Sequence, residues 1–234
     1  MTKQEILDAI KGKMIISCQA VEGEPLYVKE KSIMYLMARA AKMAGTPAIR
    51  TSSVRDVIAI KEETGLPVIG LIKIQYEGFD GYITPTMKEV DELVEAKSDV
   101  IALDCTQRQR GDGISVDEFV KEVRAKYPDI PLMADISTYE EGMNAAKLGV
   151  DIVGTTMSGY TPYSPKVDGP DYELMRRLAK DCPVPVIGEG KIHTPAQAVE
   201  ALDTGVWAIV VGGAITRPLE IAQRFMKEIE AKRG

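Results

Sequence analysis

Residues 67–73 read Pro-Val-Ile-Gly-Leu-Ile-Lys, and residues 185–191 read Pro-Val-Ile-Gly-Glu-Gly-Lys. Both stretches begin with the same apolar run, which is typical of a parallel strand buried on both faces. An ionisable residue follows each run, Lys73 in the first copy and Glu189 in the second. Active sites of α/β folds lie at the carboxyl ends of parallel strands. The two copies therefore predict a parallel α/β protein with a cation and a carboxylate beside one pocket.

The rest of the chain repeats this pattern of a short apolar run followed by a helical segment. We expect strands at Met14–Gln19, Pro47–Arg50, Val68–Ile74, Val100–Asp104, Leu132–Asp135, Ile152–Thr155, Val186–Gly188 and Ala208–Val211. Their ends lie roughly 20 to 35 residues apart, the length of one strand-plus-helix unit. Eight units without an antiparallel hairpin signal favour a closed (β/α)8 barrel over an open doubly wound sheet. We expect one such barrel domain over residues 1–234.

Signals for helix boundaries support this division. Thr2-Lys3-Gln4-Glu5 has the sequence of a capping box and predicts an extra helix before the first strand. Pro195 and Pro218 stand at expected first helical turns. The longest irregular stretch, residues 156–170, is rich in Gly, Pro, Ser and Tyr. We expect this stretch to cover the site as a lid.

The composition excludes several classes of function. The net charge is −6 without a Lys/Arg-rich block, so we expect neither nucleic acid nor a membrane as a partner. No apolar run reaches the roughly 20 residues that a membrane span needs, and residues 1–12 do not form a signal peptide. Three cysteines without C-x-x-C spacing fit a reducing compartment. The single histidine has no partner at metal-ligand spacing. We therefore expect a cytoplasmic protein without a bound metal.

Lys73 and Glu189 are the candidate acid–base pair. Lys73 shares a strand face with Ile69 and Leu71, and burial lowers the pKa of a lysine enough to make it a base near neutral pH. Glu189 shares a face with Ile187, and the third and seventh strands of such a barrel stand on opposite sides. Two structural alternatives remain open, a lysine that extends to the rim and a Lys–Glu ion pair.

Glycines after the seventh and eighth strands predict a phosphate site. Gly190 follows the seventh strand, and Gly212 and Gly213 follow the eighth. These two strand ends are the usual phosphate position in a barrel. Exposed backbone N–H groups, together with the amino end of the helix that starts near Arg217, suit a dianion. We therefore expect Gly190, Gly212, Gly213 and Arg217 to bind phosphate.

Other polar residues also stand at strand ends. Arg50 could bind a carbonyl, carboxylate or hydroxyl group, or it could form an internal salt bridge. Asp104 and Asp135 each follow an apolar strand and could bind sugar hydroxyls, orient Lys73 or cap turns. The sequence leaves these alternatives open.

Six stretches of the chain together resemble the bacterial N-acetylmannosamine-6-phosphate 2-epimerases. They are Gly-Leu-Ile-Lys at 70–73, Ala-Leu-Asp-Cys-Thr at 102–106, Met-Ala-Asp-Ile-Ser-Thr at 133–138, Thr-Met-Ser-Gly-Tyr-Thr at 156–161, Gly-Glu-Gly-Lys-Ile at 188–192 and Val-Val-Gly-Gly-Ala-Ile-Thr-Arg-Pro at 210–218. The resemblance runs from the first strand to the last helix. It implies a (β/α)8 enzyme of sialic acid and amino-sugar breakdown that interconverts N-acetylmannosamine 6-phosphate and N-acetylglucosamine 6-phosphate without a cofactor.

The resemblance also implies roles for individual residues. Lys73 would be the catalytic base and Glu189 the second catalytic residue. The sugar would be held by Gln19, Arg50 and Asp135, and the phosphate by Gly190, Gly213 and Arg217.

The chemistry at C2 of such a sugar leaves two schemes open. Lys73 would remove the proton next to the C1 aldehyde and give an enolate. Glu189 would then either donate a proton to the opposite face or position a substrate hydroxyl that carries it. Two other functions are also open, an aldolase that uses Lys73 as a Schiff base and a non-catalytic sugar-phosphate sensor. Barrels of this type commonly pair through surface helices, so we expect a homodimer.

Overall fold

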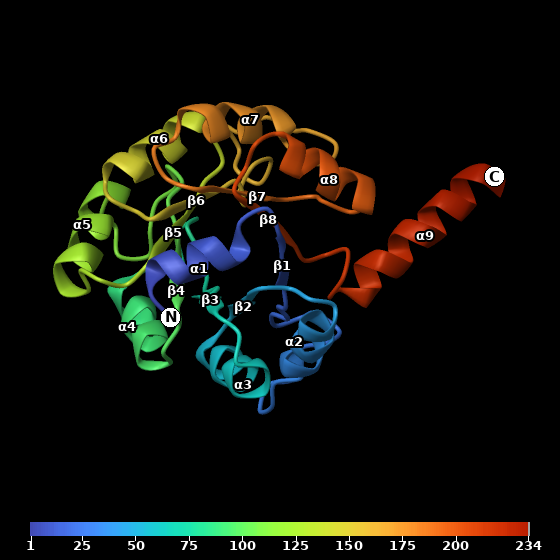
Figure 1. Cartoon of the computed structure of the whole chain (residues 1–234), viewed down its shortest axis with the longest axis horizontal. Coiled ribbons are helices and arrows are strands. Elements are labelled where there is room, and N and C mark those ends of the chain that lie inside the picture. Colours follow the sequence, from blue (N-terminus) through green and yellow to red (C-terminus); the bar gives the residue numbers. More distant parts are fainter. Residues whose placement is uncertain (234) are drawn as a thin grey trace.

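The computed structural model describes residues 1–233 and contains a closed barrel of parallel strands (Figure 1). The strands are β1 (Met14–Ser17), β2 (Ile49–Ser52), β3 (Val68–Leu71), β4 (Val100–Asp104), β5 (Leu132–Asp135), β6 (Ile152–Gly154), β7 (Val186–Glu189) and β8 (Ala208–Val211). Each strand pairs with its neighbours in the sequence, and β8 closes the barrel against β1. The expected (β/α)8 barrel is confirmed.

The helices alternate with the strands along the chain, and all but the first and the last surround the barrel in Figure 1. They are α1 (Lys3–Ile10), α2 (Met34–Met43), α3 (Val54–Thr64), α4 (Met87–Glu95), α5 (Val116–Lys126), α6 (Tyr139–Lys147), α7 (Tyr172–Asp181), α8 (Pro195–Asp203) and α9 (Pro218–Arg233). The predicted capping box at Thr2 is formed, and both predicted prolines begin helices. None of the helices in residues 1–233 is long and apolar enough to cross a membrane.

The apolar side chains form two layers on either side of the barrel wall. The inner cluster fills the barrel and includes Ile15, Ile69, Leu71, Ala102, Met133, Ile152, Ile187 and Val210. The outer cluster lies between the strands and the helices and includes Ile16, Ile49, Val68, Ile101, Leu103, Leu132, Val153, Val186 and Ile209. Because successive side chains of a strand point to opposite faces, one strand supplies both layers. This explains the continuous apolar runs that predicted the fold.

The glycine in each Pro-Val-Ile-Gly copy faces the helices. A Cβ on Gly70 would overlap Ser98 Oγ, and a Cβ on Gly188 would lie 3.0 Å from Met175 Sδ. The neighbouring residues in each strand therefore point into the barrel, and Glu189 follows at the next inward position. The repeated tetrapeptide thus sets the direction in which the β7 carboxylate points.

The chain beyond β3 differs from the sequence prediction. The parallel strand ends at Leu71 rather than Ile74, and Lys73 forms an isolated antiparallel bridge with Ile83. Two backbone hydrogen bonds hold this turn, from Ile74 N to Tyr82 O at 3.0 Å and from Thr84 N to Ile72 O at 2.7 Å. The sequence shows no antiparallel signal here, and the expected extension of the parallel strand to Ile74 is wrong. The result is that Lys73 stands above the rim of the strand, on a braced turn.

The two terminal helices are placed differently. Helix α1 lies across one end of the barrel in Figure 1, and its Ile6, Leu7 and Ile10 join the inner cluster. Trp207, just before β8, donates from Nε1 to Leu7 O at 2.8 Å. In contrast, α9 extends away from the barrel (Figure 1), and it has no buried residue. The barrel is therefore closed at one end by its own N-terminal helix.

Candidate active site

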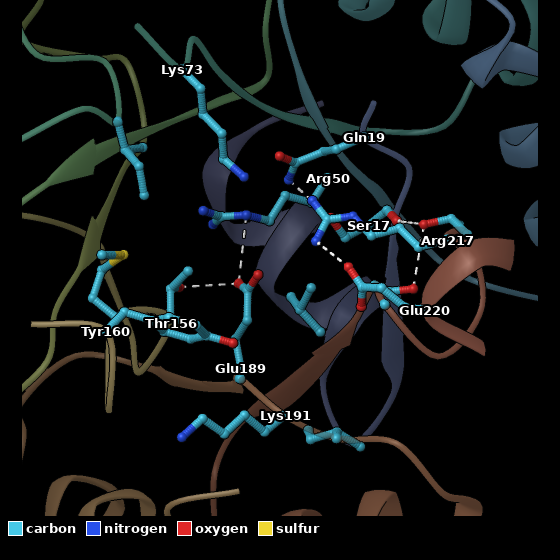
Figure 2. Close-up of a pocket in the computed structure, with 18 of the residues that line it drawn as sticks. Ser17, Gln19, Arg50, Lys73, Thr156, Tyr160, Glu189, Lys191, Arg217 and Glu220 are labelled. Atoms are coloured by element: carbon cyan, nitrogen blue, oxygen red, sulfur yellow. Dashed lines mark hydrogen bonds and ion pairs between the residues drawn. The ribbon is translucent and has the colours of Figure 1, made fainter. Parts of the chain in front are cut away.

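A cavity of about 210 Å³ is formed at the carboxyl ends of the strands. It is lined by eight residues that the sequence analysis predicted, namely Gln19, Arg50, Lys73, Glu189, Gly190, Gly212, Gly213 and Arg217. Figure 2 shows Lys73 and Glu189 pointing toward this cavity from different sides of the barrel. The fold therefore brings the predicted cation, carboxylate and glycine-bearing strand ends to one place.

Arg50 is the centre of a buried ionic cluster. Its side chain is 1% exposed, and its Nη2 lies 2.5 Å from Asp135 Oδ2 while its Nε lies 3.5 Å from Glu189 Oε2. Thr156 Oγ1 lies between the two carboxylates and donates to Asp135 Oδ1 at 2.6 Å, while Glu189 Oε2 is 3.1 Å from the same oxygen. The predicted internal salt bridge of Arg50 is thus present, and Asp135 lies fully buried behind it. Arg50 still lines the cavity, so the same guanidinium can contact a ligand.

The environment of Lys73 makes its amine more acidic than usual. Burial lowers the pKa of Lys73 from 10.5 to about 8, and the positive charges of Arg217 and Arg50 act in the same direction. Glu189 opposes this shift, but within residues 1–233 Lys73 has no ion-pair partner, because Glu189 pairs with Arg50. The structural Lys–Glu ion pair considered from the sequence is therefore wrong. A substantial fraction of Lys73 is neutral near pH 8 and can accept a proton.

Glu189 is shifted toward its protonated form. Burial raises the pKa of Glu189, and the Asp135 carboxylate raises it further, whereas Arg50 lowers it. The backbone of Glu189 is fixed by Thr155, whose Oγ1 accepts from Glu189 N at 3.0 Å and donates to Glu189 O at 2.8 Å. The cavity therefore holds a lysine with lowered pKa and a glutamate with raised pKa, an arrangement suited to proton transfer.

The glycine-bearing ends of β7 and β8 form one end of the cavity. Gly190 has a φ of 115°, which a side chain would strain, and a Cβ on Gly212 would lie 3.2 Å from Ser17 Cβ. Arg217 stands at the start of α9 and pairs with Glu24 and Glu220, each at 3.1 Å. At this end of the cavity a ligand can thus come close to the backbone and also meet the guanidinium of Arg217.

Several lining residues were missed by the sequence analysis. The polar ones are Ser17, Tyr82, Lys191, His193, Thr216 and Glu220. Strand alternation could have identified Ser17, since it lies two residues after Ile15 on an inward-facing position. Lys191 donates to Val167 O at 2.7 Å and so connects the β7 end to the 156–170 segment. That segment contributes Thr156, Met157 and Tyr160 to the cavity wall, and its action as a lid stays a prediction.

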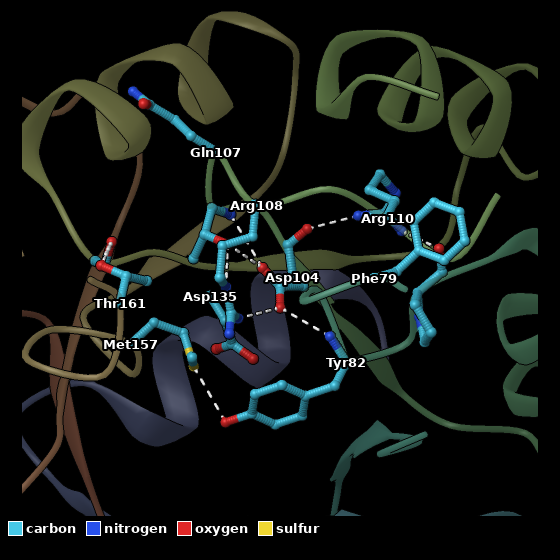
Figure 3. A network of polar contacts seen from close by, with 12 residues as sticks. Phe79, Tyr82, Asp104, Gln107, Arg108, Arg110, Asp135, Met157 and Thr161 are labelled. Carbon is cyan, nitrogen blue, oxygen red and sulfur yellow. Dashed lines mark hydrogen bonds and ion pairs between the residues drawn. The ribbon is translucent and has the colours of Figure 1, made fainter. Parts of the chain in front are cut away.

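Asp104 takes part in a local network rather than in the cavity wall (Figure 3). Its Oδ1 accepts from Thr106 Oγ1 at 2.6 Å, and its Oδ2 accepts from Arg108 Nη2 at 2.6 Å and from Tyr82 N at 3.2 Å. Tyr82 in turn donates to Met157 Sδ at 3.7 Å. Of the alternatives for Asp104, the turn-stabilising role is the one that these contacts support. The network braces Tyr82 against the cavity.

Two cysteines at strand ends, Cys18 and Cys105, are buried. Burial raises the pKa of Cys18 to about 12, and burial also raises the pKa of Cys105, so both thiols stay protonated. Residues 1–233 contain no group of three or more His, Cys, Asp or Glu side chains that could hold a metal ion. Lys73 and Glu189 remain the pair of lining residues whose shifted pKa values suit proton transfer.

A closed parallel barrel with an acid–base pair in a cavity at its strand ends defines a (β/α)8-barrel enzyme. Residues 34–231 match the model of a family described as "Putative N-acetylmannosamine-6-phosphate epimerase". The match spans more than half of the chain, and the chain therefore belongs to this epimerase family.

Individual relatives agree with the family match. The chain is 52% identical to a "Putative N-acetylmannosamine-6-phosphate 2-epimerase" of Caldanaerobacter subterraneus, over 99% of this chain and 97% of the relative. It is 49% identical to a protein of the same name from Clostridioides difficile, over 96% of this chain and 99% of that relative. Among solved structures, N-acetylmannosamine-6-phosphate 2-epimerase from Clostridium perfringens has a TM-score of 0.89 and 50% identity, covering 95% of both chains. A thiamine phosphate pyrophosphorylase from Pyrococcus furiosus, at 18% identity and a TM-score of 0.60, shares the fold alone.

Proposed function

We propose that this protein interconverts N-acetylmannosamine 6-phosphate and N-acetylglucosamine 6-phosphate by removing and returning the proton at C2, as a step of sialic acid and amino-sugar breakdown. The observation that carries this proposal is the placement of Lys73, an amine with a lowered pKa, in one cavity with the Arg50–Glu189 pair. Membership of the epimerase family supports the same substrate and favours epimerisation over the aldolase and sensor alternatives. The reaction is redox-neutral and requires no cofactor.

In the proposed mechanism Lys73 acts as the base. The proton at C2 is acidic because it lies next to the C1 aldehyde of the open-chain sugar, and its removal leaves an enolate. Arg50, which lines the cavity and carries a permanent charge, would stabilise the negative oxygen, and Gln19 would contact a sugar hydroxyl. Glu189, with its raised pKa, either donates a proton to the opposite face or positions a hydroxyl that carries it. Both schemes need Lys73.

The glycine-bearing end of the cavity would take the phosphate. Gly190, Gly212 and Gly213 allow close approach to the backbone, and Arg217 supplies a guanidinium there. The sugar would then extend from this end toward Lys73 and Arg50. Asp135 would act through Arg50, since it lies behind that side chain.

Proton NMR in D2O tests the proposed reaction directly. N-acetylmannosamine 6-phosphate incubated with the enzyme should give N-acetylglucosamine 6-phosphate with deuterium at C2. Cleavage of the carbon chain, or a borohydride-trapped covalent adduct at Lys73, would instead support an aldolase. Tight binding without any exchange at C2 would support a sensor. Either of these results contradicts the proposal.

The lowered pKa of Lys73 predicts how activity depends on pH. Below pH about 8 the free enzyme carries mostly protonated Lys73, which cannot accept a proton, so kcat/KM should rise with pH through this value. The slope should approach tenfold per pH unit between about pH 7 and 7.5, above the second phosphate ionisation near pH 6. Initial rates across pH 7–9.5 measure this. A flat profile over that range would argue against a lysine base.

We further propose that the protein is a cytoplasmic homodimer whose second copy packs on α9. This helix has no buried residue, while Leu219, Phe225, Met226 and Ile229 are exposed large apolar side chains on it. A single solvated helix of this length is marginally stable, and an exposed apolar face marks a protein contact. Light scattering should give twice the 25.6 kDa chain mass, and Phe225→Glu should shift it toward the monomer. A monomeric wild-type protein at micromolar concentration would contradict the dimer.

A further inference from the structure

Glu220 places a carboxylate at the glycine end of the cavity. It stands in the first turn of α9, and its Oε2 fills the space that a Cβ on Gly213 would need. No side chain larger than hydrogen fits at residue 213 while this carboxylate is present. The negative charge therefore lies directly against the strand end at which an anionic ligand would approach.

Two arginines hold the Glu220 carboxylate in this position. Arg217 Nη1 lies 3.1 Å from Glu220 Oε1, and Arg224 Nη1 lies 3.9 Å from Glu220 Oε2. Arg224 also donates from Nη2 to Gly213 O at 2.8 Å. Arg217 shares its guanidinium with Glu24, 3.1 Å from Nη2. The guanidinium that would contact a phosphate thus has carboxylates on both sides, of which Figure 2 shows that of Glu220.

Two further basic residues line the same cavity. Lys191 and His193 line this end of the cavity together with Glu220. Burial lowers the pKa of His193, and the positive charges of Arg224 and Lys191 act in the same direction, so the neutral imidazole is favoured. Among the described residues, the charged partners of the Glu220 carboxylate are thus the guanidiniums of Arg217 and Arg224, the kind of partner that a bound anion would take.

We propose that Glu220 is an internal substitute for the phosphate of the substrate, occupying the phosphate subsite at Gly213 and Arg217 until a sugar phosphate displaces it. The inference rests on the proposed function, because it takes the phosphate to bind at this end of the cavity. The Glu220 side chain is 40% exposed, so it can rotate into solvent without unfolding α9. The arriving phosphate then takes over the contacts that the carboxylate made.

Displacement of Glu220 would contribute to specificity. A phosphate dianion carries more charge than a carboxylate and more acceptor oxygens, so it can replace Glu220 on Arg217. A sugar without a phosphate cannot, and the subsite stays filled. Since Glu220 belongs to α9, occupation of the subsite would also change the contacts at the start of that helix.

Calorimetric titration with inorganic phosphate tests the proposal on the full-length protein. Glu220→Gln keeps the shape of the side chain and removes its charge, so phosphate no longer has to break the attraction between Glu220 and Arg217. Phosphate should therefore bind roughly fivefold more tightly, the equivalent of the attraction between two unit charges about 4 Å apart in water. Glu220→Ala, which cannot fill the subsite at all, should bind phosphate at least as tightly. Glu228→Gln is the matched control, because it removes the same charge from an exposed position of α9 and should leave the phosphate affinity unchanged.

Weaker binding by both Glu220 variants would overturn the proposal, since it would mean that Glu220 holds Arg217 in place for the ligand. Unchanged binding by both variants would also overturn it. Arg217→Ala distinguishes these results from a failure of the phosphate site itself. If neither wild-type protein nor the Glu220 variants bind phosphate, the substitute role is rejected, while C2 exchange measured in the same preparation decides separately on the epimerase.

Discussion

Replacing Lys73 by methionine should abolish deuterium incorporation at C2 and, at the same time, stabilise the folded protein. Methionine fills the same space without an amine, so the rate should fall by roughly 10²–10⁴-fold, the usual contribution of a positioned base. The stability effect follows from the lowered pKa, which falls from 10.5 to about 8 on folding. The two effects have opposite signs, and together they are specific to a buried catalytic amine.

The sign of the stability change follows from proton linkage. Because the folded-state pKa of Lys73 lies below its unfolded value, the unfolded chain binds this proton more tightly. Below pH about 8 the folded protein therefore contains a desolvated ammonium, which lowers the free energy of unfolding. The upper limit of this loss is roughly 3 kcal/mol, because each tenfold change in proton affinity corresponds to about 1.4 kcal/mol. The penalty disappears as pH rises toward 10.5. Lys73→Met should thus be more stable than wild type at pH 7 and gain nothing near pH 10.5.

Urea unfolding at the two pH values, combined with the NMR assay, measures both effects. Lys121→Met on the exposed face of α5 is the control, and it should change neither the rate of C2 exchange nor the free energy of unfolding by much. An inactive Lys73→Met with reduced stability would indicate a structural lysine. An active variant would eliminate Lys73 as the base.

Removing the charge of Arg50 should destabilise the protein more than any other single change at the site. Arg50→Met would leave the Asp135 and Glu189 carboxylates buried without their cation, which typically costs about 3–5 kcal/mol. Activity should be lost as well, because the enolate oxygen would lose its positive partner. Denaturant unfolding and C2 exchange measure these two losses.

A double variant separates the two roles of Arg50. Arg50→Met combined with Asp135→Asn removes both charges of the 2.5 Å pair while Thr156 keeps an acceptor on residue 135. Most of the stability should return, since a buried ion pair adds little over neutral groups of similar shape. Activity should not return. If stability does not recover, the damage comes from packing around Arg50 rather than from unpaired charge.

The sequence predicted the barrel well because its strands are buried on both faces. Continuous apolar runs such as residues 68–71 and 186–188 are most stable when buried on both faces, and the polar residues that follow them then converge. The convergence of Lys73, Glu189 and Arg217 on one cavity followed from this topology alone. Residue spacing along one strand was sufficient for these predictions.

Pairing between strands was not accessible from the sequence. Arg50 and Asp135 are 85 residues apart, and their contact depends on the tilt and register of four strands. The sequence also could not show that Glu189 pairs with Arg50 rather than with Lys73. Glu220 was missed for another reason, since a glutamate in the first turn of a helix is ordinarily a surface residue that interacts with the helix dipole. Only the position of Gly213 next to it reveals a different role.

The hydrogen bond between Trp207 and α1 has a practical consequence for spectroscopy. The protein contains one tryptophan, and its indole is held by Leu7 O and lies 4.3 Å from the ammonium of Lys11. Intrinsic fluorescence excited in the indole band therefore originates from the end of the barrel opposite the cavity. Trp207 is not among the residues that line the cavity, so its emission reports whether the N-terminal helix is docked. This chain thus carries its own optical reporter of global unfolding.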